Sequence, residues 1–111
     1  MKAKIYYDNE YDCLMISEKA DNEVVKKNFM FDDIIISMAG SGKIVGIEIR
    51  EASKYLKELG YNPEILNNIS DGGLVIKPKK DFLFIGFEIL GKLNNIEQRI
   101  PVANIPISCV N

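Results

Sequence analysis

The sequence predicts an α+β fold, in which a curled antiparallel sheet of about seven strands carries one main helix and one short helix. Two segments rich in β-branched and aromatic residues, 43–49 and 82–90, each end a predicted hairpin. Helical patterns lie between them, a main helix over about residues 51–59 and a short one over about 63–69. A chain of 111 residues is expected to form a single domain, residues 1–111.

The two hairpins resemble each other at a spacing of 40 residues. Shifting residues 34–49 by 40 positions places them on residues 74–89 without a gap. The identical pairs are Ile36/Ile76, Gly46/Gly86, Glu48/Glu88 and Ile49/Ile89. A period of this size is used by repeat folds, although two copies are too few for a solenoid. We favour an internal repeat; the alternative is that two buried hairpins acquired similar residues independently.

The elements of the first half are predicted from local patterns. Five strands are expected, over residues 4–7, 13–17, 24–31, 34–38 and 43–49. The fourth is apolar on both faces, which predicts a central strand, whereas Lys26 and Lys27 place the third strand at an edge or a bend. Gly42 is expected to supply a positive φ in the turn before the fifth strand. Gly46 within that strand predicts a bulge or a close backbone approach.

The main helix is predicted from an apolar face and from its end signals. Ala52, Tyr55, Leu56 and Leu59 share one face at helical spacing. Gly60 suits the position after the last turn.

The remaining elements complete the predicted sheet. Asn62 and Pro63 suit the cap and first position of the short helix, which is predicted to end at the Asp71-Gly72-Gly73 segment. Strands are then expected over residues 74–77, 82–90 and 96–100, with a turn over residues 92–95. Because of Pro101 and Pro106, residues 101–111 are expected to form only an edge strand or an extended tail.

Charge and composition exclude several classes of function. The net charge is −2, which argues against the basic surface that nucleic-acid binding requires. No run of apolar residues is long enough to span a membrane. Residues 1–4 are not followed by the apolar region of a signal peptide, so a cytoplasmic location is expected.

The supply of catalytic and metal-binding side chains is small. Histidine is absent, which removes the commonest general base and the commonest zinc ligand. Cys13 and Cys109 are expected to be packed thiols in a reducing compartment, with a disulfide as the alternative. No catalytic residue, metal site or cofactor is predicted.

Two segments that invite a ligand interpretation fail on spacing. Asp8-x-Glu10-x-Asp12 lacks the glycine and the final glutamate of an EF-hand, because Cys13 and Lys19 occupy those positions. Gly40-Ser41-Gly42-Lys43 lacks the first glycine, the hydroxyl residue and the helix of a phosphate-binding loop. Both segments are interpreted as turns.

Glu48 and Glu88 are the candidate ligand-binding residues. They occupy equivalent positions in two apolar strands of the predicted repeat. If the repeat is also spatial, the two carboxylates approach each other and can share a proton or act as general acid and base. The alternative is that each carboxylate meets a cation or a helix N-terminus at the margin of the sheet.

Two motifs together resemble a known family. Tyr7-Asp8-x-Glu10-x-Asp12-x-Leu14 and Gly42-Lys43-Ile44-Val45-Gly46-Ile47-Glu48-Ile49-x-x-Ala52-Ser53 are similar to a family of small bacterial and archaeal domains of unknown function. The resemblance covers about residues 4–60 and leaves residues 61–111 as a second hairpin and a C-terminal extension. Met15 departs from the family pattern, where a tyrosine is usual. The resemblance implies a fold, no established activity, and a small toxin-like protein as one candidate partner.

The function predicted from the residues is a non-catalytic protein-interaction or self-associating module. The alternative is a small-ligand-binding protein or a weak enzyme that uses Glu48 and Glu88. A homodimer is expected because one helix covers little of a sheet and because apolar residues gather in marginal segments. These residues are Phe29, Met30, Phe31, Ile100, Val102, Ile105, Ile107 and Val110.

Overall fold

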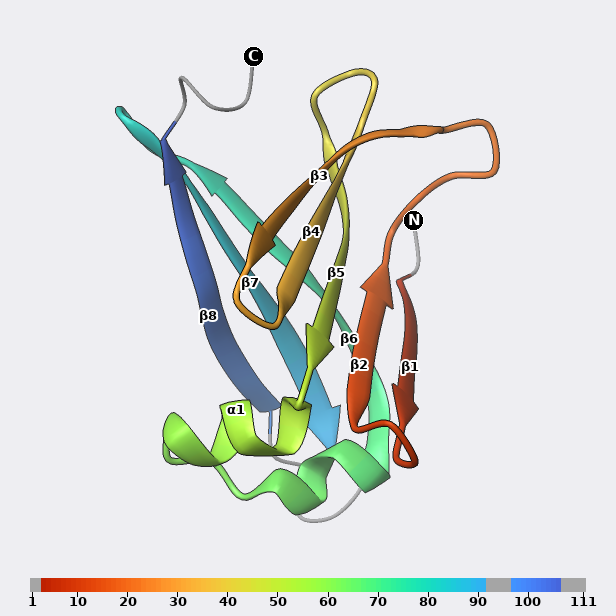
Figure 1. Ribbon diagram of the computed structural model, residues 1–111, viewed down its shortest axis with the longest axis vertical. Helices are drawn as coiled ribbons and strands as arrows, with labels where there is room; N and C mark the ends of the chain where they lie inside the picture. The colour runs from red at the N-terminus through yellow and green to blue at the C-terminus, as the bar shows by residue number, and fades with distance from the viewer. Residues whose placement is uncertain (1–2, 92–96, 107–111) are drawn as a thin grey trace.

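Two antiparallel sheets and two short helices make up the described chain (Figure 1). The computed structural model describes residues 3–91 and the backbone of residues 97–106. The five-stranded sheet has the order β1-β2-β5-β4-β3, with β1 Lys4–Asp8, β2 Cys13–Ser17, β3 Val25–Phe31, β4 Ile34–Ala39 and β5 Ile44–Arg50. The three-stranded sheet has the order β6-β7-β8, with β6 Ile69–Pro78, β7 Phe82–Gly91 and β8 Glu97–Pro106. The helices are α1, Ala52–Glu58, and the 3-10 helix η1, Pro63–Asn68.

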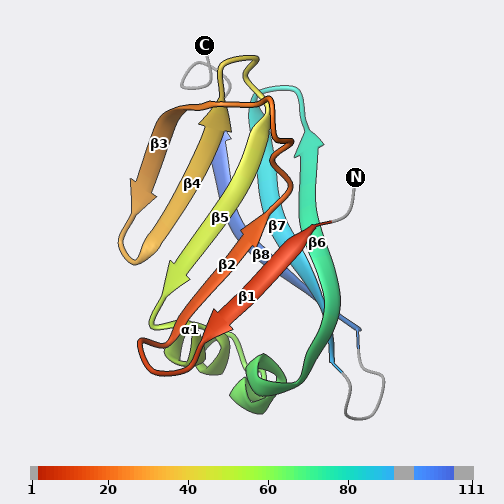
Figure 2. The same ribbon diagram turned by 90° about the vertical axis from the view of Figure 1, so that its right-hand side faces the viewer.

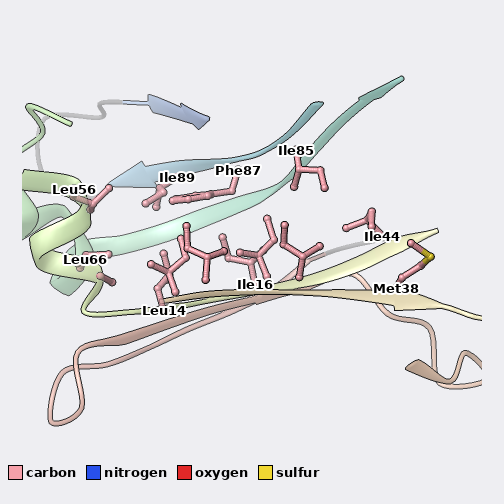
Figure 3. Close-up of a cluster of buried hydrophobic side chains, with 14 residues drawn as sticks. Leu14, Ile16, Met38, Ile44, Leu56, Leu66, Ile85, Phe87 and Ile89 are labelled. Atoms are coloured by element: carbon pink, nitrogen blue, oxygen red, sulfur yellow. The ribbon is translucent and has the colours of Figure 1, made fainter. Parts of the chain in front are cut away.

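The core lies between the two sheets, so the prediction of one curled sheet is wrong. Ile16 and Ile47 of the five-stranded sheet are buried in the same apolar cluster as Ile85, Phe87 and Ile89 of β7 (Figure 3). Each sheet therefore covers the apolar face that the other would expose. The fold is mostly β, with two short helices, rather than a helix laid on a single sheet.

Helix α1 closes one end of the space between the sheets instead of covering a face (Figures 1 and 2). Leu56 of α1 and Leu66 of η1 join the core there, and they are only 1% and 2% exposed (Figure 3). The main helix was predicted correctly, but Leu59 was wrongly placed on its buried face. Leu59 is 43% exposed because the helix ends at Glu58 and residue 59 is already its C-cap.

The predicted signals around the short helix are confirmed, but its end is not. The Asn62 side chain accepts a hydrogen bond of 3.0 Å from the backbone N–H of Glu64, and Pro63 is the first helical residue. Gly60 has the expected positive φ of 89°. The stop predicted at residues 71–73 is wrong, because β6 begins at Ile69 and runs through both glycines.

Edge and turn predictions agree with the topology. β3 is an edge strand, while β4 and β7 each lie between two neighbours, and β8 forms the edge expected around its prolines. Gly42 has a φ of 91°. A bulge lies beside Gly46, because Ser37 is opposite Gly46 whereas Met38 is opposite Ile44. The predicted turn at 92–95, Ile107, Cys109 and Val110 lie outside the described residues.

The hairpins that resemble each other in sequence share the same faces but differ in register. Ile47 and its equivalent Phe87 both face the core. Ile36 lies opposite Ile47, whereas Ile76 lies opposite Ile85 instead of Phe87. The second hairpin is therefore shifted by two residues, a slip that keeps every side chain on its own face.

Candidate functional site

The two candidate glutamates do not meet in space. Ile47 and Ile49 on β5 and Phe87 and Ile89 on β7 face the core between the sheets. Side chains alternate along a strand, so the residue between each pair faces away from that core. Glu48 therefore lies on the outer face of one sheet and Glu88 on the outer face of the other. A shared proton between these two carboxylates is excluded by this arrangement.

Each glutamate has its own surroundings. The Glu48 carboxylate accepts a hydrogen bond of 3.3 Å from Arg50 Nε, two residues along the same strand, and the two side chains form an ion pair. The alternative interpretation expected such a cation partner, but at the margin of the sheet, whereas Glu48 lies on its central strand. Glu88 lies opposite Gly73 on β6 and opposite Arg99 in the register of β8. It also lines a shallow hollow of about 290 Å³ with Asp71 and neighbouring strand residues.

Glu48 is the centre of a row of side chains that crosses the outer face of the five-stranded sheet. Residues opposite each other on neighbouring strands share a face. The strand registers give the members of this outer row in order as Tyr6, Met15, Glu48, Ile35 and Met30. Tyr6 is 57%, Met15 37% and Met30 66% exposed. Four of the five side chains are thus apolar or aromatic, on a face that no described element covers.

The family-like motif residues form a second cluster, at the base of α1. The Asp12 carboxylate accepts three hydrogen bonds: 2.5 Å from Tyr7 Oη, 3.0 Å from the Ser53 N–H and 2.6 Å from Ser53 Oγ. Its backbone carbonyl also accepts a hydrogen bond of 2.9 Å from the Ala52 N–H. Glu51, the N-cap residue, has a left-handed φ of 52° and makes no side-chain cap. Asp12 therefore caps the helix from 41 residues away.

The electrostatics of the Asp12, Tyr7 and Ser53 cluster indicate a structural brace, which holds the β1–β2 turn to α1. Burial raises the pKa of Asp12, but hydrogen bonds from Ser53 and Tyr7 outweigh it and hold the pKa below its ordinary value. Burial, the hydrogen bond to Asp12 and the nearby negative charges raise the pKa of Tyr7 to about 12. At neutral pH the carboxylate is charged and the phenol is protonated, so neither group is poised to exchange a proton.

The acidic turn before this cluster also has a structural role. Asp8 Oδ1 accepts hydrogen bonds of 3.0 Å from the Glu10 N–H and 3.2 Å from the Tyr11 N–H, which close the turn. Asp12 turns the chain with a φ of 53°. Within residues 3–91, no three acidic or thiol side chains are grouped as a metal site would need. The interpretation of this segment as a turn is confirmed.

Sequence reasoning missed both the outer row and the Asp12–Ser53 contact. The contact had one available signal, because Asp12 and Ser53 belong to the two motifs that carry the family resemblance. The row had none, since it depends on the registers of four strand pairs, which the local pattern of residues does not specify. Cys13, the cysteine that the structure describes, is a half-buried free thiol whose pKa is raised by burial and then by the charge of Glu48.

A small cleft lies where the β3–β4 turn meets α1. Its volume is about 340 Å³, and its walls include Phe31, Asp32, Arg50, Lys54 and Tyr55. Asp32 holds a left-handed φ of 52° in that turn. The walls mix both signs of charge with two aromatic rings, which is a chemistry that polar small molecules can bind.

The fold and these clusters define a small two-sheet protein of mostly β structure, whose polar groups brace the chain and whose outer face carries apolar side chains. The chain belongs to the family described as Protein of unknown function (DUF2283), whose model matches residues 4–53. The resemblance of the two motifs to a family without known function is thereby confirmed.

Comparison with other proteins finds an uncharacterized relative. The chain is 35% identical over 89 residues to an uncharacterized protein of Methanocaldococcus jannaschii. The aligned region covers 80% of this chain and 73% of that protein. No solved structure matches the chain significantly. In the described part of the chain, none of the helices is long and apolar enough to cross a membrane.

Proposed function

We propose that this protein is a non-catalytic interaction module that self-associates through the open side of its five-stranded sheet. The observation that carries the proposal is the outer row, in which Tyr6, Met15, Ile35 and Met30 lie on an uncovered face. Large exposed apolar patches are rare on monomeric proteins and commonly mark interaction sites. A second copy is the simplest partner, because two-fold dimers are the commonest closed assembly.

Solution mass tests the proposal directly. Light scattering over a range of protein concentrations is expected to give a mass that rises toward twice the 12.5 kDa of one chain. Met30→Asp, which puts a charge on the most exposed aliphatic member of the row, is expected to shift the mass toward the monomer. Tyr11→Asp is the matched control, because Tyr11 is 75% exposed and lies in the β1–β2 turn outside the row. A mass of one chain at every concentration contradicts self-association.

A different protein is the second candidate partner. The family resemblance suggests a small toxin-like protein, and the same outer row would supply its binding surface. Pull-down with the wild-type chain and with Met30→Asp separates the two cases. The second partner is supported if the chain is monomeric by light scattering and the wild type retains a defined small protein. Met30→Asp should then fail to retain that protein.

Small-ligand binding is the alternative function. It was predicted to use Glu48 and Glu88 together, and their opposite faces leave each as a separate candidate. The cleft of about 340 Å³ beside Asp32, Arg50 and Tyr55 favours a ligand elsewhere, next to α1. A thermal-shift screen of polar metabolites tests this alternative, because a ligand that binds the native state raises the melting temperature. Loss of a positive shift in Arg50→Ala would assign the ligand to the cleft.

A further inference from the structure

β3 is the open edge of the five-stranded sheet. It pairs with β4 alone, and Figure 2 draws it at the outer margin of its sheet, with no described strand or helix beyond it. All its residues are exposed except Phe29, which is half-buried. The strand contains no proline, and its far side presents backbone groups to which a further strand can pair.

The other sheet edges are less available. β1 and β6 lie next to each other where the two sheets approach. The Leu74 N–H of β6 already donates a hydrogen bond of 2.6 Å to the Glu18 carboxylate. β8 contains Pro101 and ends at Pro106, and a proline has no N–H to donate to an added strand. β3 is therefore the described edge that is most open to a further strand.

The charges along β3 select an antiparallel partner with the same sequence. Lys26 and Lys27 lie near its start, and Asp32 and Asp33 come directly after its end. A parallel copy would place lysines beside lysines. An antiparallel copy places the lysines of each chain beside the aspartates of the other, which is the complementarity that fixes orientation at interfaces.

Two-fold symmetry and charge together narrow the register to a centre on Phe29 or on Met30. In an antiparallel pair related by a two-fold axis perpendicular to the sheet, one residue must lie opposite its own copy. Centring the pair on Met30 brings Lys27 to the β3–β4 turn of the second copy, which carries Asp33. It also places Asn28 opposite Asp32 of the second copy. Centring on Asn28 would instead oppose both lysines to apolar residues of the second copy.

We infer that β3 pairs with β3 of a second copy, antiparallel and centred on Met30, to make one continuous sheet across a dimer. This inference rests on the proposed self-association and places its contact at the β3 edge of the five-stranded sheet, where the outer row ends at Met30. Phe29 and Phe31 lie on the core side of β3, since they are opposite the buried Ile36 and Ile34. The centred register stacks Phe29 on Phe31 of the second copy, which covers the 41% exposed Phe31 ring. Met30 meets its own copy on the outer face and joins the two outer rows end to end.

Disulfide trapping tests the register. In a background with Cys13→Ser and Cys109→Ser, Met30→Cys is expected to form a covalent dimer under mild oxidation. Directly opposite residues have Cα atoms about 4.5–5.5 Å apart, within the disulfide range of about 4.4–6.8 Å. Asn28→Cys is the matched control, because four residues of offset separate it from its copy by about 14 Å. Its side chain is also exposed and on the outer face, so both thiols are accessible to oxidant.

Charge exchange tests the pairing independently. Lys27→Glu and Asp33→Lys are each expected to weaken the dimer about tenfold or more in sedimentation equilibrium, and the double variant is expected to restore it. Thermal unfolding of each variant checks that the monomer fold is retained. If the wild type is a dimer but Asn28→Cys cross-links in place of Met30→Cys, or the charge exchange has no effect, the β3 mode is overturned while self-association stands. If the wild type is a monomer throughout, self-association and the β3 mode fail together.

Discussion

At the scale of the residue, Asp12 shows how one side chain carries a family motif. It combines a left-handed backbone with hydrogen bonds from Tyr7 and Ser53, and it caps α1 from a distant turn. An aspartate suits this position because it tolerates a positive φ and accepts several bonds at once. Glu48, by contrast, occupies a motif position on the outer surface, where its near partner is Arg50. Of these two motif carboxylates, Asp12 is structural and Glu48 lies on the surface.

Tyr7 is expected to make the protein less stable at alkaline pH. Its pKa is raised from 10.0 to about 12 in the folded chain. Between these values the unfolded chain loses a proton that the folded chain keeps, so the free energy of unfolding falls as pH rises through this window. Below 10.0 the contribution is fully present. Tyr7→Phe removes the titrating group and is expected to flatten this part of the pH dependence.

Urea unfolding on both sides of this window measures the effect. The difference in midpoint between wild type and Tyr7→Phe should shrink as pH approaches 12. Tyr55 serves as an internal reference, because its pKa is also raised by burial and it is present in both proteins. A difference that stays constant across the window would mean that the phenol of Tyr7 titrates no later than that of an unfolded tyrosine.

At the scale of the element, α1 closes one end of the space between the sheets, and both of its ends are specified by nearby residues. Asp12 supplies the cap at its start, and Gly60, with a φ of 89°, lies just after its end. Its seven residues are too few for an isolated helix to be stable in water. Burial of Leu56 between the sheets supplies the missing stabilisation, about 1.5–3 kcal/mol for one leucine side chain.

Leu56→Asp tests this account of the helix. The substitution places an unpaired charge at a site that is 1% exposed, so the domain is expected to lose its cooperative thermal transition. Leu59→Asp makes the same chemical change three residues later, at a site that is 43% exposed, and should change the melting temperature by only a few degrees. Equal effects of the two substitutions, measured by circular dichroism, would contradict the observed orientation of α1.

At the scale of the whole molecule, the two sheets come close at a glycine. A Cβ atom added to Gly72 on β6 would overlap the Glu88 carbonyl oxygen and lie 2.7 Å from Ile5 Cδ1. The first contact is to the neighbouring strand of the same sheet, and the second is to β1 of the other sheet. A side chain at this position would therefore force the sheets apart or break the β6–β7 ladder.

Gly72→Ala is accordingly expected to lower the free energy of unfolding by about 1–3 kcal/mol, the usual cost of overpacking. Gly40→Ala is the control, since its added Cβ would meet the flexible Lys26 side chain at 3.2 Å. Denaturant titration of both variants gives the comparison. A Gly72→Ala protein as stable as the wild type would show that the sheets can separate at this point without loss.

Local pattern was sufficient for much of this molecule. Runs of β-branched and aromatic residues predicted most of the strands, because that information is carried by residues close together in the sequence. Capping by Asn62 and the positive φ of Gly42 and Gly60 were predicted for the same reason: turn chemistry depends on a few consecutive residues.

Only the tertiary structure decided how these elements combine. Two hairpins with similar patterns can lie in one curled sheet or face each other, since both arrangements bury the same faces, and the second occurs here. That choice sends Glu48 and Glu88 to opposite surfaces and separates the predicted pair. A two-residue slip of register leaves the alternation unchanged, so Ile76 meets Ile85 without any local signal. The bond from Ser53 to Asp12 joins residues 41 apart, and it forms because β1, β2 and β5 pair in the order that brings that turn to the helix.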